Sequence, residues 1–549
     1  MNALVPLPVL LPLCATGLSL AFGTRLGRFQ RFISVAVLSA VLALSVILMI
    51  AADRQGPLSV HLGDFAPPLG ITLVADRLSG LMLTVSSAIT LCVLVYSLGQ
   101  GMTDRDKETP LAVFHPAYLI LVAGVSCTFL SGDLVNLFVG FEIMLVASFV
   151  LLTLGGTGPR MRAGSTYVII SLFSSMLFLT AIAMTYAATG TANFAQLAGR
   201  LADLPIGVQT LIQALLLTVF AIKAAVFPLA AWLPDSYPTA PAPVTAVFAG
   251  LLTKVGVYCM LRTETLLFPG NRIGDLLMAI ALASMVIGIL GAVAQTDLKR
   301  LLSFTLISHI GYMVFGIGLA TREAYGGAIV YVAHHITVQT TLFLVAGLIE
   351  RRGGTTELTR LGGLTRAAPM LAVLFFVPAM NLAGIPPLSG FIGKLGLMRA
   401  GVADGGGWAW LLVAGSAATS LLTLYVVAKV WNLAFWRAAP PGQAVAGTVL
   451  ESGDDSDDDT DAGPDRIHGT GDEGVATPRP AGEAVAATLH ERAVITTVRL
   501  PRPMIAATAA TVAIGLAFTV FAGPLTAFTD RTAAEILRRT PYVQEVLGR

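Results

Sequence analysis

The stretch LLLTVFAIKAAVFPLAAWLP, residues 215–234, combines an apolar run of helix length with a lysine and a helix breaker. Lys223 lies near its middle, and Pro228 follows shortly after. Proline removes a backbone donor and opens a helix, which a membrane tolerates only where the freed carbonyl groups are buried in protein or face water. The stretch therefore predicts an interrupted transmembrane helix beside an internal polar path.

A second stretch repeats this combination. Residues 371–397, LAVLFFVPAMNLAGIPPLSGFIGKLGL, place Pro386 and Pro387 ahead of Lys394. The two stretches are the seventh and twelfth apolar spans of the chain, and this odd offset makes two five-helix units run in opposite senses across a bilayer. Inverted repeats with interrupted helices near the midplane are typical of transporters. We therefore expect two half-channels that meet inside the membrane.

The composition agrees with a membrane protein. Of 549 residues, 55% are hydrophobic and 12% charged, and the mean hydropathy is +0.79, whereas a soluble domain carries about 25% charged residues. Apolar runs of roughly 18 residues or more are long enough to span a bilayer as helices. We predict an all-α polytopic membrane protein with about fourteen transmembrane helices, near residues 4–22, 32–51, 79–98, 111–130, 134–155, 164–189, 208–233, 244–263, 274–294, 301–320, 326–350, 368–398, 407–436 and 504–528.

The order of these spans predicts five regions. The segment before the last helix holds 12 acids and 5 bases, so like charges repel and few apolar residues are available to bury. We expect it to be a disordered cytoplasmic loop. The regions are 1–110, with helices 1–3 and an outward loop; 111–263, the first repeat (helices 4–8); 274–436, the second, inverted repeat (helices 9–13); 437–501, the acidic loop; and 502–549, with helix 14 and a tail.

The orientation follows from Lys and Arg in the short loops. If both termini lie outside, the inward loops hold 13 of these residues and the outward loops hold 7. Cytoplasmic loops of membrane proteins are enriched in Lys and Arg. We therefore predict that both termini lie outside.

The lysines are distributed unusually. The chain has 28 arginines but six lysines, and Lys223, Lys254 and Lys394 lie inside apolar spans. A charge at the centre of a spanning helix costs about 2.5–3.5 kcal/mol, so these lysines need a function. A desolvated lysine can release its proton, whereas an arginine stays protonated. We interpret them as proton carriers; the alternative is that each extends to the nearest interface, which we expect for Lys429.

Glu142, in LFVGFEIMLVA, is the single carboxylate deep inside a predicted span. An unpaired carboxylate there is expensive, so it should pair with one of the buried lysines. A static pair that fixes helix packing is one alternative. A switch is the other: closing a pair of Glu142 with Lys223 favours the protonated lysine, and opening it releases the proton. The sequence leaves open which lysine is the partner.

Histidines continue the series of titratable groups. His309 lies in the tenth span, and His334 and His335 lie in the eleventh, with Gln339 one helical turn after His335. Histidine titrates near neutral pH and suits a proton relay. We place His335 in the relay and treat His309, His334 and Gln339 as possible members. The alternative for each is a helix-to-helix hydrogen bond.

Other chemistries lack a motif. No HExxH spacing, nucleophile triad or phosphate loop occurs, and the four cysteines lie inside apolar runs without a CxxC pair. We therefore predict no metal site, no cofactor, no nucleic-acid partner and no catalysis by this chain itself.

Three segments carry a resemblance to a known family. They are KAAVFPLAAWLPDSYPTAPAPVTAVFAGLLTKVGVY (223–258), AQTDLKRLLSFTLISHIGYMVFGIGL (294–319) and NLAGIPPLSGFIGKLGL (381–397). Together they resemble the antiporter-like subunits of respiratory NADH:quinone oxidoreductase (complex I) and, more closely, the D subunit of Mrp-type multisubunit Na⁺/H⁺ antiporters. The resemblance covers about residues 70–435. It implies that Glu142 is the family's fifth-helix glutamate, and that Lys223, Lys254 and Lys394 are the lysines of the seventh, eighth and twelfth helices.

This sequence departs from the family at one position. Relatives often carry a lysine in the eleventh helix, where the matching residue here is Gln339. Glutamine does not titrate, so a link between Lys254 and Lys394 would depend on His335 and water.

The resemblance implies an ion-translocating subunit of a Na⁺/H⁺ antiporter in a prokaryotic plasma membrane. Its partners would be protons, Na⁺ or another monovalent cation, the lipid bilayer and the other subunits of a hetero-oligomeric complex. One alternative is a proton-pumping subunit of a complex I-like oxidoreductase or a membrane-bound hydrogenase, with the redox groups in partner chains. Another is a membrane scaffold whose buried charges are inert.

Overall fold

The computed structural model describes residues 1–22, 29–100, 111–438 and 500–548. Within these residues thirteen helices are long and apolar enough to cross a membrane. Two shorter helices, α16 (Pro369–Ala383) and α17 (Ser389–Asp404), follow each other where the twelfth span is predicted. The prediction of an all-α polytopic membrane protein is confirmed. Nearly all of the predicted acidic loop, 437–501, lies outside the described residues.

The first half of the bundle contains one small sheet among its helices. Its α-helices are α1 (Leu7–Phe22), α2 (Phe29–Gln55), α3 (Arg77–Gln100), α4 (Leu111–Leu130), α5 (Leu134–Thr153), α6 (Gly158–Thr189), α7 (Phe194–Arg200), α8 (Ile206–Ala224), α9 (Leu233–Ser236), α10 (Ala242–Val247) and α11 (Thr253–Leu266). The other elements are strands β1 (Leu58–His61) and β2 (Thr72–Ala75), the π-helix η6 (Phe248–Leu252), and the 3₁₀ turns η1 (Asn2–Leu4), η3 (Leu62–Asp64), η4 (Leu201–Asp203) and η5 (Tyr237–Thr239).

The described part of the second half contains eight α-helices besides α16 and α17. These are α12 (Gly274–Ala294), α13 (Leu298–Leu319), α14 (Arg322–Gly353), α15 (Leu364–Ala367), α18 (Gly407–Val430), α20 (Arg502–Val520), α21 (Ala522–Arg538) and α22 (Thr540–Leu547). A 3₁₀ turn, η7 (Leu358–Arg360), and a π-helix, η8 (Trp431–Trp436), complete it.

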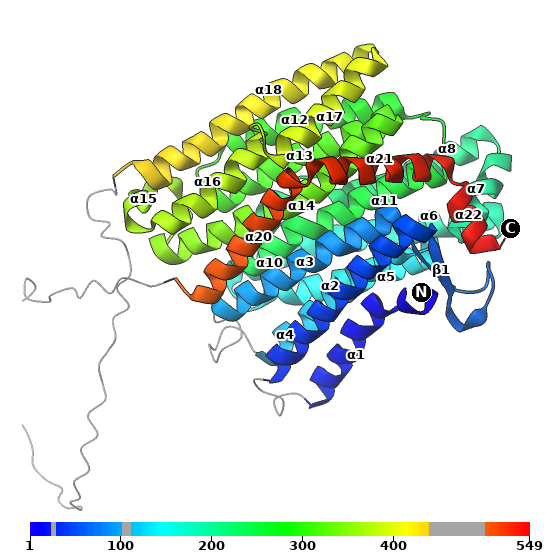
Figure 1. Ribbon diagram of the computed structural model, residues 1–549, viewed down its shortest axis with the longest axis horizontal. Coiled ribbons are helices and arrows are strands. Elements are labelled where there is room, and N and C mark those ends of the chain that lie inside the picture. Colours follow the sequence, from blue (N-terminus) through cyan, green and yellow to red (C-terminus); the bar gives the residue numbers. More distant parts are fainter. Residues whose placement is uncertain (23–28, 101–110, 439–499, 549) are drawn as a thin grey trace, which may run out of the picture.

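The strands β1 and β2 mark one end of the bundle. They pair antiparallel, with Leu58 opposite Ala75 and His61 opposite Thr72. The predicted outward loop is therefore partly a hairpin, and its Leu-Ser-Val-His and Thr-Leu-Val-Ala sequences contain the β-branched residues that suit a strand. Both η1 and α22 contact β1, so the two termini lie at this same end (Figure 1). We call it the hairpin end.

Three spans form the centre of the bundle. The most apolar windows of α14 and of the continuous span α10–η6–α11 are entirely buried by protein, and nearly all of α13 is buried. By contrast, α1, α2, α6, α18 and α20 leave most of their apolar residues at the surface, as lipid-facing helices do. Figure 1 shows α14 in the middle of the bundle. The central spans carry most of the predicted relay.

Two helices are interrupted at the predicted prolines. Helix α8 ends at Ala224, and Pro228 lies in the non-helical segment before α9. Helix α16 ends at Ala383, and Pro386 and Pro387 lie in the segment before α17. The residues that end the two helices, Ala225 and Gly384, both have positive φ values, of 56° and 84°.

The last predicted span, 504–528, is too long. Helix α20 ends at Val520, and the chain turns at Phe521 into α21, which lies against α14 and leads to α22 at the hairpin end (Figure 1). Apolar residues at the start of α21 continue the hydrophobic run in the sequence. Its Asp530, Arg531 and Glu535 make it more polar than α20, which has no charged residue after Arg502.

One capping motif occurs twice. The carboxylate of Asp133 caps α5, and Asp133 pairs with Asn193 through a β-bridge at the hairpin end, where the amide of Thr72 also binds it. Asp297 caps α13 in the same way and pairs with Glu357 shortly before α15, at the far end of the bundle (Figure 1). Each residue of the second pair stands 164 positions after its counterpart in the first.

Candidate functional site

The five predicted carriers lie on five different helices in the interior. Glu142 is on α5, Lys223 on α8, Lys254 on α11, His335 on α14 and Lys394 on α17. Lys254 and His335 are fully buried, and Lys394 is nearly so. Glu142 and Lys223 are half-buried. A proton can pass between such groups where hydrogen bonds or single water molecules connect them.

A serine connects Glu142 with Lys223. The Ser175 hydroxyl of α6 donates to Glu142 Oε1 at 2.5 Å, and the Lys223 ammonium donates to Ser175 Oγ at 3.4 Å. The ammonium also lies 5.6 Å from the centre of the Phe141 ring. Among the ion pairs of the described residues there is none that joins Glu142 directly to Lys223. The sequence left open which lysine lies near Glu142. In the structure Lys223 is the lysine that shares the Ser175 hydroxyl with Glu142.

Lys254 sits at the middle of the continuous span α10–η6–α11. Its ammonium donates to the carbonyl oxygen of Ala249 at 2.6 Å, inside the π-helical turn. A π-turn shifts the backbone hydrogen-bond pattern by one residue, and such turns occur often at functional sites. No ion pair of the described residues includes Lys254, so a neutral carbonyl group is the acceptor for this buried charge.

The histidines gather between Lys254 and Lys394. The rings of His309 and His335 stack with their centres 5.1 Å apart. His309 Nδ1 lies 2.5 Å from the Tyr331 hydroxyl, and His334 Nδ1 lies 3.0 Å from the Ser389 hydroxyl. The structure therefore brings all three predicted histidines into one cluster.

Several polar atoms of this cluster lack a protein partner. They are Nε2 of His309, Nε2 of His334, both ring nitrogens of His335 and Oε1 of Gln339. The amide group of Gln339 donates to the Leu302 carbonyl at 2.8 Å, so its oxygen is free to accept. Buried polar atoms are normally satisfied by protein or by ordered water. These atoms are the groups in this region that could hold a water chain.

Lys394 lies against the break between α16 and α17. Its ammonium donates to the carbonyl oxygens of Leu382 and Ala383, both at 3.1 Å. These are carbonyls of the last turn of α16, which have no helical donor because the helix ends there. Gly384 must remain small, because a Cβ atom at this residue would lie 3.0 Å from the Lys394 side chain. The break thus provides the acceptors for the lysine.

Asn381 and Ser389 join this break to the histidines. Asn381 Oδ1 accepts from the amide of Gly390 at 2.8 Å and from the hydroxyl of Ser389 at 3.3 Å. The same hydroxyl contacts His334. Neither residue was predicted, since a lone Asn or Ser in a span gives no distinctive signal.

The structure buries a second carboxylate besides Glu142 within a span, which was not predicted. Helix α11 continues to Leu266, so Glu264 lies inside the span and is 5% exposed. Gln213 of α8 donates to its two oxygens at 3.1 and 2.9 Å. The predicted span stopped at residue 263 because Arg262 and Glu264 resemble the start of a polar loop.

Arg262 is also buried, in an ion pair. Its guanidinium donates to both carboxylate oxygens of Asp76, at 2.6 and 2.8 Å. Arg77 likewise binds Asp53 at 2.8 Å and contacts Glu535. These two arginines, which lie at the ends of predicted spans, are therefore held in ion pairs at the hairpin end. Within the described residues, no group of three or more His, Cys, Asp or Glu is arranged to hold a metal ion.

Buried titratable groups and two interrupted helices inside a bundle of spanning helices define the class of ion-translocating membrane proteins. Residues 131–423 match the family described as "NADH:quinone oxidoreductase/Mrp antiporter, TM". The chain belongs to this family.

Several individual proteins are similar to this chain over most of its length. The D subunit of the Na⁺/H⁺ antiporter of Alkalihalophilus pseudofirmus is 42% identical over 440 residues, which cover 79% of this chain and 87% of that protein. In the structure of the Mrp complex from Dietzia sp. DQ12-45-1b, one chain matches with a TM-score of 0.84 and 30% identity, over 100% of this chain and 99% of that one. A chain of the archaeal membrane-bound sulfane sulfur reductase matches with a TM-score of 0.81 at 21% identity, over 100% of both chains, and shows the shared fold.

Proposed function

We propose that this chain is an ion-translocating subunit of a multisubunit monovalent cation/proton antiporter. The observation that carries the proposal is the contact of Glu142 and Lys223 with one hydroxyl group, in a bundle where Lys254 and Lys394 have neutral acceptors. The relatives that are named as D subunits of Na⁺/H⁺ antiporters support sodium as the exchanged cation. Transport rather than catalysis is the role that these similarities favour.

The proton path runs from Glu142 and Ser175 to Lys223, then to Lys254, the His335 cluster and Lys394. When the Glu142 carboxylate is close, the protonated form of Lys223 is favoured; when the two separate, the proton is released to the next carrier. The neutral acceptors of Lys254 and Lys394 do not lock these groups in the charged form. The free nitrogens of His335 support its place between the two lysines.

Two architectural proposals complete this picture. The repeated capping motif of Asp133 and Asp297, at opposite ends of the bundle, supports two inverted five-helix repeats. The excess of Lys and Arg in one set of loops supports a location of the hairpin end outside the cell. The lipid-facing surface of the outer helices leaves room for the other subunits of a hetero-oligomer.

The test uses everted membrane vesicles that contain the whole gene cluster. A pH gradient is preset, and its collapse on addition of Na⁺ is compared between wild type, Glu142→Gln and Lys223→Ala. Assembly of each variant complex is first verified by native gel electrophoresis. We expect sodium-dependent collapse in wild type and none in either variant.

Two results would contradict the proposal. Exchange at the wild-type rate in an assembled Glu142→Gln complex would remove this residue from the path. A gradient that ignores Na⁺ but forms on addition of NADH or another electron donor would identify a redox-driven pump instead, with the same residues carrying protons.

A further inference from the structure

Glu264 lies in the half of α11 that is nearest the hairpin end, away from the proposed path. The carboxylate is 5% exposed, and its partner Gln213 is 1% exposed. Ten residues separate Glu264 from Lys254 on one continuous helix, which corresponds to about 15 Å. A buried carboxylate with a neutral amide as its hydrogen-bond partner is expensive for a membrane protein to keep, and such groups mark ion pathways.

Glu264 lines a cavity. The space has a volume of about 120 Å³, which is room for several water molecules. Thr265 and Asn271 contribute further oxygen atoms, and Tyr325 of α14 lies on its wall. Ile317 and Ala320 also line it, which places the C-terminal end of α13 there. A helix C-terminus carries partial negative charge, so the cavity favours a cation.

The charged groups near Glu264 leave its carboxylate without an ion pair among the described residues. Arg539, between α21 and α22, donates to the Leu266 carbonyl at 3.2 Å. Arg272, in the loop after α11, donates to Gln209 of α8 at 2.7 Å. The groups that face it from α8 and α14 are the amide of Gln213 and the phenol of Tyr325.

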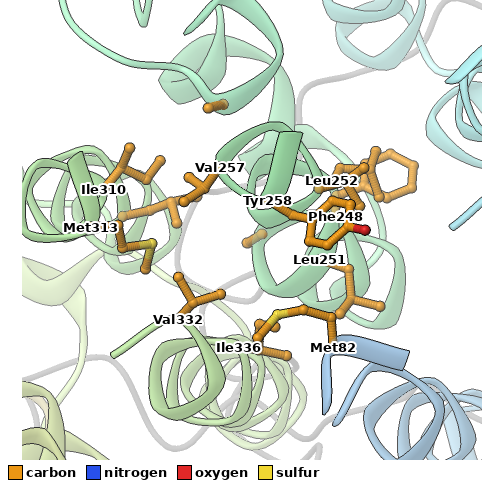
Figure 2. Close-up of a cluster of buried hydrophobic side chains, with 14 of the residues drawn as sticks. Met82, Phe248, Leu251, Leu252, Val257, Tyr258, Ile310, Met313, Val332 and Ile336 are labelled. Atoms are coloured by element: carbon orange, nitrogen blue, oxygen red, sulfur yellow. The ribbon is translucent and has the colours of Figure 1, made fainter. Parts of the chain in front are cut away.

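An apolar layer separates this cavity from the proposed carriers. On α13, Met313 stands between His309 and the cavity residue Ile317; on α14, Val332 stands between His335 and Tyr325. On α11, Val257 lies one turn beyond Lys254. Figure 2 shows Val257, Met313 and Val332, together with Ile310, around one space between the three helices. All four side chains are apolar and buried.

We propose that Glu264 is a proton-accepting carboxylate where the proton path opens at the hairpin end. The Val257–Met313–Val332 layer is then a hydrophobic barrier between Glu264 and the Lys254–His335 region. Hydrophobic constrictions of this kind gate ions by losing and regaining water. This inference rests on the proposed antiporter function and names the residue through which protons leave or enter on that side.

The first test compares Glu264→Gln, Glu264→Asp and Glu142→Gln in everted vesicles with verified assembly. If Glu264 transfers protons, Glu264→Gln lowers the rate of Na⁺-driven gradient collapse by about tenfold or more, because it removes a proton-transfer group. Glu264→Asp keeps a titratable group and retains most of the rate with a changed pH profile. Wild-type rate and pH profile in Glu264→Gln would overturn the proposal.

Sodium could bind the same oxygen atoms, and the assay separates the two cations. A proton site predicts that Glu264→Gln leaves the Na⁺ concentration for half-maximal exchange unchanged. A clear rise in that concentration at an unaltered pH profile would show a sodium site and overturn the proton assignment. The result with Glu142→Gln reports on the proposed function separately, because that variant must be inactive whatever happens at Glu264.

A second measurement does not depend on transport. Dicyclohexylcarbodiimide reacts with protonated carboxyl groups in apolar surroundings, so peptide mass mapping of the intact complex should find label on Glu264, with less label as the pH rises. Absence of label at every pH would overturn the assignment. For the barrier, Val332→Thr combined with Val257→Thr should increase Na⁺-independent proton leak. The matched control is Val345→Thr, also buried on α14 but outside the layer; equal leak in the control would contradict the barrier.

Discussion

The hairpin end and the middle of the bundle bury charge in opposite ways. At the hairpin end arginine meets carboxylate: Arg262 holds Asp76 with two hydrogen bonds, and Arg77 holds Asp53. In the middle, the ammonium groups of Lys254 and Lys394 have backbone carbonyls as acceptors. Arginine is thus paired with carboxylate in one region, and lysine is surrounded by neutral dipoles in the other.

This difference separates a structural role from a transport role. A buried pair of opposite charges is costly to break, so each partner fixes the other. Arg77, through Glu535, holds α21 to the rest of the hairpin end in this way, whereas the pair of Arg531 with Asp53 is more exposed and contributes less. A lysine bound to carbonyls keeps acceptors without being locked in its charged form, and it can lose its proton where an arginine cannot. The choice between arginine and lysine therefore follows the function of each region.

The largest effect is expected when a carrier is given a permanent charge. Lys254→Arg and Lys394→Arg preserve the positive charge but cannot release a proton, so exchange in assembled complexes should fall by roughly 100-fold or more. The measurement is Na⁺-driven collapse of a pH gradient. The matched control is Lys429→Arg: Lys429 donates to the Val293 and Gln295 carbonyls near the end of α12, outside the path, and its replacement should leave exchange intact. Exchange at the wild-type rate in assembled Lys254→Arg and Lys394→Arg complexes would contradict the proposed transport role of these lysines.

The next effect concerns stability rather than transport. Arg262→Met leaves the Asp76 carboxylate buried without its partner, which should cost about 3–5 kcal/mol of folding free energy. We expect a lower melting temperature of the purified complex, with the rate of exchange per assembled complex unchanged. The double variant Arg262→Met with Asp76→Leu removes both charges and should recover much of the loss. Reduced exchange in a stable Arg262→Met complex would instead assign Arg262 to the transport path.

The stabilisation by the ion pair of Arg262 with Asp76 should depend on pH. Burial raises the pKa of Asp76, but the guanidinium of Arg262 and the hydrogen bonds from Ser79 outweigh this effect, and its pKa lies below the usual value. A carboxylate with a lowered pKa in the folded state stabilises the protein above the pKa of the unfolded chain, about 4 for aspartate, and loses that contribution as the pH falls through the folded value. The protection of the amides of residues 72–80 against hydrogen exchange, relative to the intrinsic rate at each pH, should therefore stay constant from neutral pH down to about 5 and decrease below about 4. A loss of protection already near neutral pH would contradict the ion pair.

The sequence was most informative where residue type conflicted with its surroundings. A lysine such as Lys223 in an apolar run, or a proline such as Pro228 inside a span, violates a strong physical rule of membrane helices and is therefore easy to find. The spans themselves follow from length and hydropathy alone. For this reason the fold and the positions of the buried lysines could be predicted without coordinates.

What the sequence could not show are contacts that depend on three dimensions. Ser175 is an ordinary residue for a span, and its place between two charged groups appears when α5, α6 and α8 are packed together. Glu264 was taken for part of a loop because its neighbour Arg262 is charged, and the partner that neutralises Arg262 is 186 residues away. The turn at Phe521 was missed because apolar residues continue on both sides of it.

The smallest of these effects is expected at Ser175. It tests whether this hydroxyl couples the Glu142 carboxylate to the Lys223 ammonium. Its hydroxyl receives a hydrogen bond from Lys223 and donates one to Glu142. Hydrogen bonds to charged groups contribute roughly 1.5–3 kcal/mol, but a water molecule could replace the hydroxyl, so Ser175→Ala should slow exchange by about tenfold or less. Ser175→Thr keeps the hydroxyl and should retain the wild-type rate. A structural effect alone would lower both variants alike, whereas a bridging role lowers Ser175→Ala and also alters its pH profile, because the coupling between carboxylate and ammonium changes.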